Sequence, residues 1–351
     1  MIKKLDLVNF RNYEKHGFEF GKTTLIVGPN ASGKTNILEA IYALAIGKSF
    51  RADRETEVIK EAVGDRVARV AGTVGDTELE IIWDGRLGLR KLYKVNGVGK
   101  RQVDFVGNFW AVLFSPLDLA IVINSPATRR RYLDSVLTPV HKDYRVSLMV
   151  YEKALRQRNR LIWKIRESRI SSYGSRAQME YWDKLLITNG KVIHDRRKDY
   201  LAFLSTIHDS IFKIQLVYDH SIVSDERLAR YGNEEIAAAA TLVGPHRDDF
   251  TIYHQLPSRN QELSHYGSRG EQRLATFALK LGELEYIQSV TGERPVLLLD
   301  DIFSELDAVN RRHILKVVPE QQTIITTTDI HTSEEKFLAK LGAGRIGLGG
   351  S

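Results

Sequence analysis

Cysteine is absent from this sequence of 351 residues, and long apolar runs are absent as well. Without cysteine there is no disulfide framework, no Cys-x-x-Cys redox site and no cysteine zinc site, so the chain suits a reducing compartment. No run approaches the roughly 18 apolar residues that a membrane-spanning helix needs. The opening residues, MIKKLDLVNF, carry charges where a secretory signal needs an apolar core. We therefore expect a cytoplasmic protein that does not itself span a membrane.

Positive charge exceeds negative charge, and the excess is concentrated in the middle of the chain. The whole sequence has 51 Lys and Arg against 44 Asp and Glu, a net charge of +7. Residues 120–240 alone hold 21 basic and 14 acidic side chains, which accounts for the entire excess. This pattern favours a polyanion partner, either nucleic acid or an acidic membrane surface. Arg-rich helix faces that are merely solvated would give the same pattern.

Hydrophobic periodicity predicts two α/β segments on either side of a helical one. Expected strands lie at residues 2–10, 23–27, 109–114, 295–300 and 322–327, and within a β-rich stretch at 66–102 that contains an Asn-Gly hairpin signal. Expected helices lie at 36–47, after a loop at 28–35, and within 266–288. We expect one α/β domain formed by residues 1–125 and 241–351 and split by a helical insertion at 126–240.

Residues 126–214 have a helical texture that predicts an antiparallel hairpin or small bundle. One arm is marked by positions in steps of mostly three and four, namely Trp182, Leu186, Asn189, Ile193, Arg196, Tyr200, Leu204, Ile207 and Ile211. A turn is expected at 168–175. Ordinary amphipathic helices packed on a globular body are equally compatible with this pattern.

A phosphate loop follows the strand expected at 23–27. The pattern G-x-x-x-x-G-K-[ST] is matched by Gly28, Pro29, Asn30, Ala31, Ser32, Gly33, Lys34 and Thr35. Its position between a strand and a helix makes the match specific. Glycines let the backbone wrap phosphates, while successive N–H groups and the helix N-terminus point at the anion. We expect Lys34 at the β and γ phosphates and the Thr35 hydroxyl on Mg²⁺.

A second apolar strand, residues 296–299, ends in two carboxylates, Asp300 and Asp301. Two adjacent carboxylates at a strand end are costly without a cation between them. Asp300 is therefore expected beside the Mg²⁺, and Asp301 is placed to orient or deprotonate an attacking water. Lys34, Asp300 and Asp301 are the candidate catalytic residues.

Two further stretches narrow the class of phosphate-loop protein. Ser268-Arg269-Gly270-Glu271 opens a helix before the acidic strand, and residues 304–307 (SELD) follow that strand. This order resembles the ATP-binding-cassette heads, in which the Ser-Gly helix start closes on the γ-phosphate bound by the opposite subunit. The resemblance implies two composite ATP sites in an ATP-dependent homodimer, with Ser268, Gly270 and Glu271 making the contact in trans.

Motifs from end to end resemble those of the RecF family, short bacterial relatives of the SMC and Rad50 proteins. They are residues 7–13 (LVNFRNY), 48–51 (KSFR), 114–116 (FSP), 129–134 (RRRYLD), 244–249 (GPHRDD), 266–268 (YGS) and 299–301 (LDD). The resemblance implies an SMC/Rad50-like ATPase head of the cassette type, split by a mainly helical lobe. SMC proteins have long arms, and Rad50 has a cysteine zinc hook. A chain of 351 residues without cysteine has room for neither.

The family resemblance also implies a function. RecF proteins bind ATP and DNA and act at gaps and stalled forks. With RecO and RecR they help RecA replace single-strand-binding protein, and they support the SOS response from the nucleoid. Their DNA-stimulated ATPase is slow. Asp301 stands where transporters have Glu, and the shorter Asp fits a switch rather than a pump. Arg269 and Glu271 stand where many relatives have Gln, and Glu271 still resembles the signature of SMC proteins.

By the same resemblance, Arg11 faces the base or ribose of ATP and Arg51 faces the phosphates, with surface salt bridges as the alternative for both. Residues 246–249 (HRDD) fit a structural polar cluster or a DNA-contacting turn better than a metal site, because no second His follows at a usable spacing. Residues 326–329 lie where cassette heads carry a switch, and His331 is close to them.

No readable DNA-binding motif is present, so the basic helical segment is the candidate for gapped, single-stranded and double-stranded DNA. The residues proposed for phosphate contact are Arg129, Arg130, Arg131, Arg156, Arg158, Arg160, Arg196, Arg197 and Lys198.

Two other functions remain open at this point. The ATPase subunit of a membrane transporter would use the basic insertion to dock on a membrane partner. A nuclease of the overcoming-lysogenisation type would join a similar head to an acidic metal site, although no such carboxylate cluster follows the head in this sequence.

Overall fold

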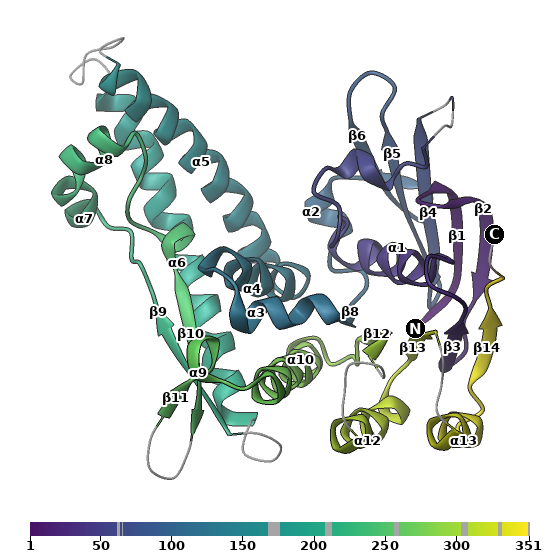
Figure 1. Ribbon diagram of the computed structural model, residues 1–351. Coiled ribbons are helices and arrows are strands. Elements are labelled where there is room, and N and C mark those ends of the chain that lie inside the picture. Colours follow the sequence, from purple (N-terminus) through teal and green to yellow (C-terminus); the bar gives the residue numbers. More distant parts are fainter. Residues whose placement is uncertain are drawn as a thin grey trace. The chain divides into compact units, whose positions relative to one another are not determined.

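The computed structural model describes residues 1–61, 64, 66–167, 176–207, 213–255, 260–302, 308–328 and 332–349 (Figure 1). It contains two compact units. Unit 1 joins residues 1–119 to residues 279–351, and unit 2 is the intervening segment 120–278. The α/β domain with an inserted segment, expected from the sequence, is therefore present.

Unit 1 contains an antiparallel sheet with the strand order β2-β1-β4-β5-β6-β7. Its strands are β1 Ile2–Phe10, β2 Tyr13–Glu19, β4 Val67–Val74, β5 Thr77–Asp84, β6 Arg90–Val95 and β7 Val98–Lys100. The predicted Asn-Gly hairpin joins β6 to β7, and Asn96 and Gly97 take φ values of 50° and 75°. Positive φ at both central residues is what a two-residue hairpin requires.

The other sheet of unit 1 is parallel, with the order β14-β3-β13-β12-β8. Its strands are β3 Thr23–Val27, β8 Ala111–Phe114, β12 Val296–Asp300, β13 Thr323–Thr327 and β14 Gly344–Gly347. All five residues of β12 and of β13 are buried, as expected for parallel strands covered on both faces. Because parallel strands end at one edge, the loops after β3 and β12 emerge together.

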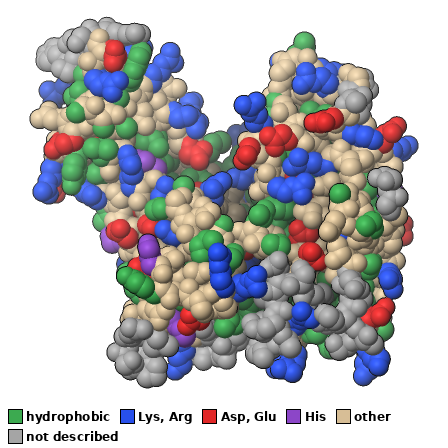
Figure 2. All heavy atoms as spheres, viewed as in Figure 1, with side chains coloured by type: hydrophobic (Ala, Val, Ile, Leu, Met, Phe, Trp, Pro, Cys, Tyr) green, Lys and Arg blue, Asp and Glu red, His purple; other side chains and the backbone are tan. Residues whose placement is uncertain are grey.

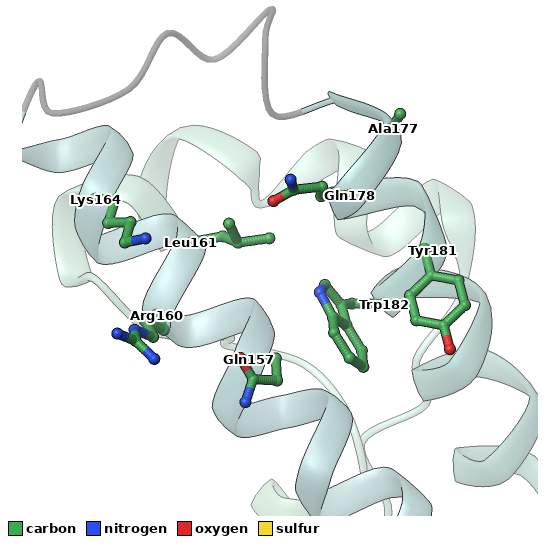
Figure 3. Close-up of a pocket in the computed structure, with 8 residues that line it drawn as sticks. All are labelled: Gln157, Arg160, Leu161, Lys164, Ala177, Gln178, Tyr181 and Trp182. Carbon is green, nitrogen blue, oxygen red and sulfur yellow. The ribbon is translucent and has the colours of Figure 1, made fainter.

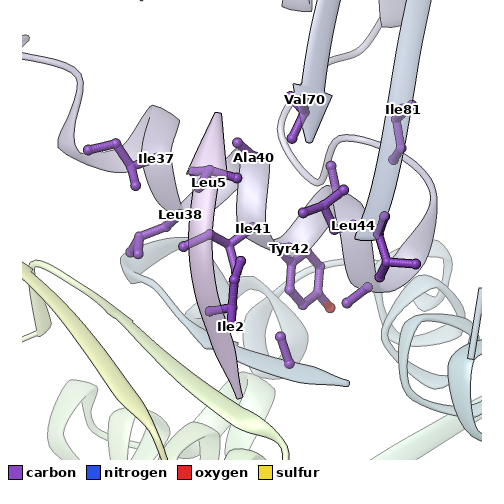
Figure 4. Close-up of a cluster of buried hydrophobic side chains, with 14 of the residues drawn as sticks. Ile2, Leu5, Ile37, Leu38, Ala40, Ile41, Tyr42, Leu44, Val70 and Ile81 are labelled. Atoms are coloured by element: carbon purple, nitrogen blue, oxygen red, sulfur yellow. The ribbon is translucent and has the colours of Figure 1, made fainter. Parts of the chain in front are cut away.

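Helix α1 (Lys34–Ile46) contacts strands of both sheets, including β4 and β5 of the antiparallel sheet and β12 and β13 of the parallel one. A helix covered on all sides should be apolar all round, and every residue from Ile37 to Ile46 is buried. The core of unit 1 gathers these side chains with Ile2, Leu5 and residues of β4 and β5 (Figure 4). Gly47, at a φ of 74°, ends the helix.

Unit 2 contains three long helices and a small antiparallel sheet with the order β11-β10-β9. The helices are α4 Pro126–Val140, α5 Lys142–Arg166 and α6 Arg176–Ile207, and the strands are β9 Ile214–Asp219, β10 Asp249–Gln255 and β11 Asn260–Glu262. Helices α5 and α6 contact each other along their lengths and confirm the predicted hairpin. The turn predicted at 168–175 lies outside the described residues.

Shorter helices are present in the described parts of both units. They are α2 Gln102–Phe105, α3 Ala120–Ile123, α7 Asp225–Arg230, α8 Gly232–Ala238, α9 Leu263–Tyr266, α12 Ala308–Val317 and α13 Thr332–Lys340, with 3-10 turns at Glu55–Val58, Pro116–Leu119, Pro245–Arg247 and Val318–Glu320. Helix α10 (Arg269–Thr291) begins in unit 2 and ends in unit 1. None of the described helices combines the length and apolar character needed to cross a bilayer.

The boundary of the C-terminal segment differs from the expectation. Residues 241–278 pack with the helical segment, and unit 1 resumes only at residue 279. The physical reason is strand pairing, because β10 pairs antiparallel with β9 from Asp249 opposite Asp219 to His254 opposite Ile214. The helix start at Ser268 therefore belongs to unit 2, whereas the acidic strand belongs to unit 1.

Candidate nucleotide-binding site

The phosphate loop connects β3 to α1, and its backbone requires glycine at Gly33. Ala31 and Gly33 take φ values of 65° and 99°. A Cβ atom on Gly33 would lie 2.6 Å from Asn12 Nδ2 and 2.7 Å from the Tyr13 hydroxyl oxygen. A φ of 99° strains any residue with a side chain, and a side chain would also force Asn12 and Tyr13 to move. Gly33 is also the N-cap of α1 and makes no side-chain cap, so the first N–H groups of this helix face the loop and suit an anion.

Lys34 is the first residue of α1, and its ammonium group lies against the loop. Its Nζ donates to the carbonyl oxygens of Gly28 at 2.7 Å and Pro29 at 2.8 Å, and the residue is only 7% exposed. Burial lowers the pKa of Lys34, and the nearby carboxylates of Asp301 and Asp300 oppose that change. The ammonium is therefore confined at the loop, close enough to the two acidic residues to interact with their charges.

Asp300 ends β12 and joins the acidic strand to the phosphate loop. Its Oδ1 accepts hydrogen bonds from the hydroxyl of Thr35 at 2.9 Å and the hydroxyl of Thr326 at 2.8 Å. Burial raises the pKa of Asp300, and these two hydrogen bonds oppose the increase. Thr326 lies opposite Asp300 in the parallel pairing of β12 with β13. The structure thus brings together Thr35 and Asp300, which are 265 positions apart.

Asp301 follows in a left-handed conformation at a φ of 50°. Its backbone N–H donates to the carbonyl and to the hydroxyl oxygen of Thr326, both at 3.1 Å. Asp residues tolerate this conformation better than most. Thr326 therefore holds both acidic residues, a role the sequence did not indicate beyond placing residues 326–329 in a switch region. Asp329, His331 and the SELD stretch 304–307 lie outside the described residues.

The oxygen set fits a hard divalent cation. A threonine hydroxyl and a buried carboxylate meet at one point, and Mg²⁺ prefers oxygen ligands, of which substrate phosphates and waters commonly supply the remainder. Thr35 and Asp300 are the residues that would hold it.

Two buried hydroxyls at the loop lack a hydrogen-bond partner within the described part of the chain. They are those of Tyr13, which is 8% exposed, and Ser32. Burial raises the pKa of Tyr13 to about 12, so its hydroxyl keeps its proton. Buried polar groups are almost always satisfied, and exceptions concentrate where a ligand binds. These hydroxyls therefore fit a loop that receives an anion.

Arg11 and Arg51 both lie beside the buried carboxylate of Glu39 in α1. Arg11 donates to Glu39 through two nitrogens, at 2.9 Å and 2.6 Å, and to the Glu57 carbonyl oxygen at 2.8 Å. Arg51 donates to Asn36 Oδ1 at 2.8 Å. The guanidinium of Arg11 is thus engaged within the protein, as in the salt-bridge alternative, whereas the side chain of Arg51 is 38% exposed. Glu39 was not singled out in the sequence.

The helix start at Ser268 is a capping box. The Ser268 N–H donates to Glu271 Oε2 at 2.8 Å, and the Glu271 N–H donates to the Ser268 hydroxyl oxygen at 3.3 Å. The Glu271 carboxylate accepts hydrogen bonds from the N–H and the hydroxyl of Ser268 and from His254, and these lower the pKa of Glu271. Ser268, Arg269 and Gly270 are exposed. The Ser268 hydroxyl is engaged with Glu271 within the chain, and Glu271 has a local structural role.

The nine cations proposed for DNA contact do not share one environment. Arg131, Arg156, Arg160 and Lys198 are exposed, and Arg196 is half-buried beside Asp143. Arg129 pairs with Asp249 at 2.6 Å, and Arg130 donates to the Asp248 carbonyl oxygen at 2.7 Å. Figure 2 shows Lys and Arg spread over the visible face of both units, with acidic and hydrophobic side chains between them.

The prediction for Arg158 and Arg197 needs correction, because these two residues are 3% and 2% exposed. Arg197 donates to Asp134 and Asp248, both at 2.9 Å, and to the Pro245 carbonyl oxygen at 2.8 Å. Arg158 pairs with Asp183 at 2.5 Å and Glu235 at 2.6 Å. Buried charges are retained where they are paired, so these arginines stabilise unit 2 and do not reach a ligand at its surface.

The HRDD stretch 246–249 belongs to the same polar cluster. Asp248 accepts hydrogen bonds from Arg197, from the Tyr218 hydroxyl and from the Ser221 N–H. His246 Nε2 faces the Thr241 carbonyl oxygen at 3.0 Å, which can only accept, so Nδ1 accepts from the Tyr151 hydroxyl at 2.8 Å. These contacts agree with the structural interpretation of the stretch.

We expect His246 to make the protein less stable as the pH falls from about 6.5 to about 4. Burial lowers the pKa of His246 to about 4, whereas a histidine of the unfolded chain titrates near 6.5. In this window the unfolded chain holds the proton and the folded chain does not, so stability that is complete above pH 6.5 is lost on acidification, by up to about 3 kcal/mol. Urea unfolding of wild type and His246→Gln at several pH values measures this loss. If the difference in unfolding free energy between the two proteins did not change with pH, His246 would not be the source of the loss.

A groove of about 520 Å³ opens between α5 and α6 (Figure 3). Arg160, Leu161 and Lys164 line it from α5, and Tyr181 and Trp182 line it from α6. Tyr181 is 57% exposed, and its ring meets that of Trp182 edge-on with centroids 4.8 Å apart. The groove thus combines cations with an accessible aromatic ring. Of the residues that line this groove, the sequence had indicated only Arg160 as a DNA contact.

Comparison with known proteins adds three findings. Residues 1–339 match the family model described as the RecF/RecN/SMC N terminal domain. The chain is 36% identical over 386 residues to the DNA replication and repair protein RecF of Chloroflexus aggregans, covering 98% of this chain and 97% of that one. It is 37% identical to the RecF of Herpetosiphon aurantiacus, covering 97% and 96%.

Solved structures agree with these relatives. A structure of the recombination mediator protein RecF with ATP, from the RecFOR pathway, superposes with a TM-score of 0.83 at 33% identity and covers 94% of this chain and 92% of that one. The Smc head domain of Pyrococcus furiosus superposes with a TM-score of 0.51 at 19% identity and covers 99% of this chain and 92% of that one. The second likeness concerns the fold alone.

Proposed function

Because this chain belongs to the RecF family of DNA replication and repair proteins, we propose that it is an ATP-dependent DNA-binding protein that dimerises with ATP and acts in recombinational repair of gaps. The observation that carries the proposal is the contact of Thr35 with Asp300 beside the buried Lys34. By family resemblance, its partners are RecR and RecO, and through them RecA, with a role in SOS induction. The relatives reported above do not support the transporter alternative.

The geometry of the loop supports a role for each residue of the proposed nucleotide site. The backbone of the loop and the N-terminus of α1 bind the phosphates, and Lys34 places a compact charge against them. Thr35 and Asp300 would hold Mg²⁺, and the ion would neutralise phosphate charge. Asp301, positioned through its backbone by Thr326, orients the attacking water or takes its proton. Asp is shorter than Glu and holds a water less closely, which suits slow hydrolysis used as a switch.

ATP-dependent dimerisation depends on the helix start of α10. An exposed helix N-terminus that opens with serine suits a phosphate bound by a second copy of the chain.

We expect Ser268→Arg to leave ATP binding by the single chain unchanged and to abolish the ATP-dependent dimer. The long cation occupies the position where the γ-phosphate held by the partner must approach. ATP affinity and molar mass in saturating ATP, measured on the same protein, test this. Ser264→Arg, on the preceding helix α9, is the matched control. A Ser268→Arg protein that still dimerised with ATP would contradict the trans role.

DNA binding is proposed for the groove between α5 and α6 and for the exposed cations Arg131, Arg156, Arg160 and Lys198. Cations that follow a phosphate backbone, with an aromatic ring for base stacking, are the means by which proteins bind single strands without reading sequence. Binding of this kind is insensitive to sequence and weakens steeply with salt.

We expect Arg160→Gln combined with Lys164→Gln to lower the slope of log affinity against log salt concentration by about 1.5, because two phosphate contacts are lost. Tyr181→Ala should weaken single-strand binding by about 1–3 kcal/mol and affect duplex binding less. Fluorescence anisotropy with gapped, single-stranded and blunt duplex DNA, with ATP, measures both. The control is Lys153→Gln with Lys191→Gln, which removes two exposed charges outside the groove. An unchanged slope in the groove variant would overturn this location.

A further inference from the structure

Glu39 is a buried acid at an unusual place in the nucleotide-binding unit. It lies in α1 one turn after Thr35, among apolar residues, and is completely inaccessible to solvent. A buried carboxylate is costly unless its oxygens are paired. Arg11 supplies a two-point contact at 2.6 Å and 2.9 Å, and the Ser49 hydroxyl donates at 2.5 Å. These partners satisfy the carboxylate before any contact with Arg51 is considered.

Arg51 has a weaker attachment to the same carboxylate. Its closest nitrogen is 3.6 Å from Glu39 Oε2, which is beyond hydrogen-bond length, and its firm contact is with Asn36 Oδ1 at 2.8 Å. The backbone of this stretch is nevertheless fixed, because the N–H groups of Arg51 and Ala52 donate to the Ser49 hydroxyl at 3.0 Å and 2.8 Å. The main chain of Arg51 is thus anchored while its guanidinium is restrained mainly by charge.

The guanidinium of Arg51 lies at the first turn of α1, next to the phosphate loop. Its partner Asn36 directly follows Thr35, and the charge of Arg51 helps to lower the pKa of Asp300 against the effect of burial. The side chain of Arg11, by contrast, is 15% exposed, and all three of its guanidinium nitrogens donate to Glu39 or to the Glu57 carbonyl oxygen. Of the two arginines, Arg51 alone combines exposure, loose attachment and an electrostatic effect on the Mg²⁺-binding carboxylate.

We propose that Glu39 is a positioning residue that holds Arg51 beside the phosphate loop and competes with the nucleotide triphosphate for it. When the triphosphate binds, Arg51 exchanges the distant carboxylate for phosphate oxygens, to which a guanidinium can donate two hydrogen bonds. Arg11 keeps Glu39 neutralised during this exchange. The negative charge of Glu39 therefore lowers the affinity for ATP, and does so through Arg51. The inference rests on the proposed binding of ATP.

The test is a double-mutant cycle on ATP affinity in the presence of Mg²⁺. Glu39→Gln removes the competing charge and should tighten ATP binding about 3- to 10-fold, the size expected for one partly screened charge contact. Arg51→Ala should weaken binding by a similar or larger factor. In the Arg51→Ala background, Glu39→Gln should no longer change ATP affinity. Additive effects, or weaker binding by Glu39→Gln alone, would overturn the proposal.

Loss of a buried partner also lowers stability, so a second variant is needed in case Glu39→Gln does not fold. Glu39→Asp keeps a charge for Arg11 but withdraws it from Arg51 by about one C–C bond length. It should tighten ATP binding by a smaller factor, again only when Arg51 is present. An Asp variant with wild-type ATP affinity would count against the competition.

The matched control is Glu80→Gln, which removes a buried acid paired with Arg69 and Lys94 in the antiparallel sheet. Glu80→Gln should lower thermal stability without changing ATP affinity. If Glu39 had only a structural role, Glu39→Gln would show the same two results. A wild-type protein that bound no ATP would overturn the proposed function itself. If the wild-type protein bound ATP but the effects of Glu39→Gln and Arg51→Ala on ATP affinity were additive, only the role of Glu39 would be overturned.

Discussion

Replacing Lys34 by arginine is expected to leave measurable ATP binding and to lower the rate of hydrolysis by about 100-fold or more, the loss typical when a positioned charge at the transition state is removed. The Lys34 ammonium lies in a space bounded by the carbonyls of Gly28 and Pro29 and is only 7% exposed. A planar guanidinium is wider and cannot reproduce that point charge. Binding of a fluorescent ATP analogue and phosphate release, measured on one preparation, separate the two effects.

Lys48→Arg is the control for this change, because Lys48 is an exposed lysine just beyond the same helix. It should alter neither ATP binding nor hydrolysis. If Lys34→Arg hydrolysed ATP at the wild-type rate, the phosphate-loop assignment would be contradicted.

Replacing Arg197 by alanine is expected to lower the free energy of unfolding by about 3–5 kcal/mol, the cost of removing one partner from a buried ion pair. The change leaves Asp134 and Asp248 without the cation that lies 2.9 Å from each of them. The Pro245 carbonyl and the Tyr144 hydroxyl also lose a donor. Denaturant unfolding followed by circular dichroism measures the loss.

The neighbouring residue supplies a matched control. Arg196 pairs with Asp143, and their side chains are 35% and 48% exposed. Arg196→Ala should therefore cost no more than about 1 kcal/mol. If Arg197 instead contacted DNA at the surface, Arg197→Ala would weaken DNA binding and leave stability close to that of Arg196→Ala, and that result would contradict the buried network.

This pair of residues also shows where the sequence was insufficient. From Ile193 to Tyr200, a helical seam in steps of three and four can pass through position 196 or position 197. The periodicity predicts Arg196 in the seam, but Arg197 is the buried residue. A charged residue at a buried position is recognisable only from its partners, and Asp134 and Asp248 come from distant parts of the chain.

The nucleotide site was largely predictable because its determinants are consecutive in the sequence. The phosphate loop is one stretch of eight residues, and the rule that parallel strands end at one edge brings Asp300 to Thr35. Thr326 and Glu39 were not predictable in their roles. Thr326 acts through its register opposite Asp300, and Glu39 lies in an apolar helix whose partners come from the β1–β2 turn and from residues 49–51.

The small sheet of unit 2 was missed for a related reason. Strand β9 has six residues and follows the long helix α6 in the sequence. Strands β10 and β11, of seven and three residues, come after two further short helices. Antiparallel pairing between residues 30 to 40 positions apart, from Asp219 with Asp249 to Ile214 with His254, leaves little trace in local periodicity. This pairing moves residues 241–278 from the predicted ATPase segment to the helical unit.

The central claim is that ATP joins two copies of this chain into a DNA-binding dimer, and multi-angle light scattering tests it most directly. The molar mass is measured without nucleotide, with ATP and Mg²⁺, and with ATP in the presence of gapped or blunt duplex DNA. We predict the mass of one chain without nucleotide and of two chains with ATP, and binding of gapped DNA by the dimer. A protein that remained a single chain at saturating ATP, or that formed the same dimer without nucleotide, would contradict the account.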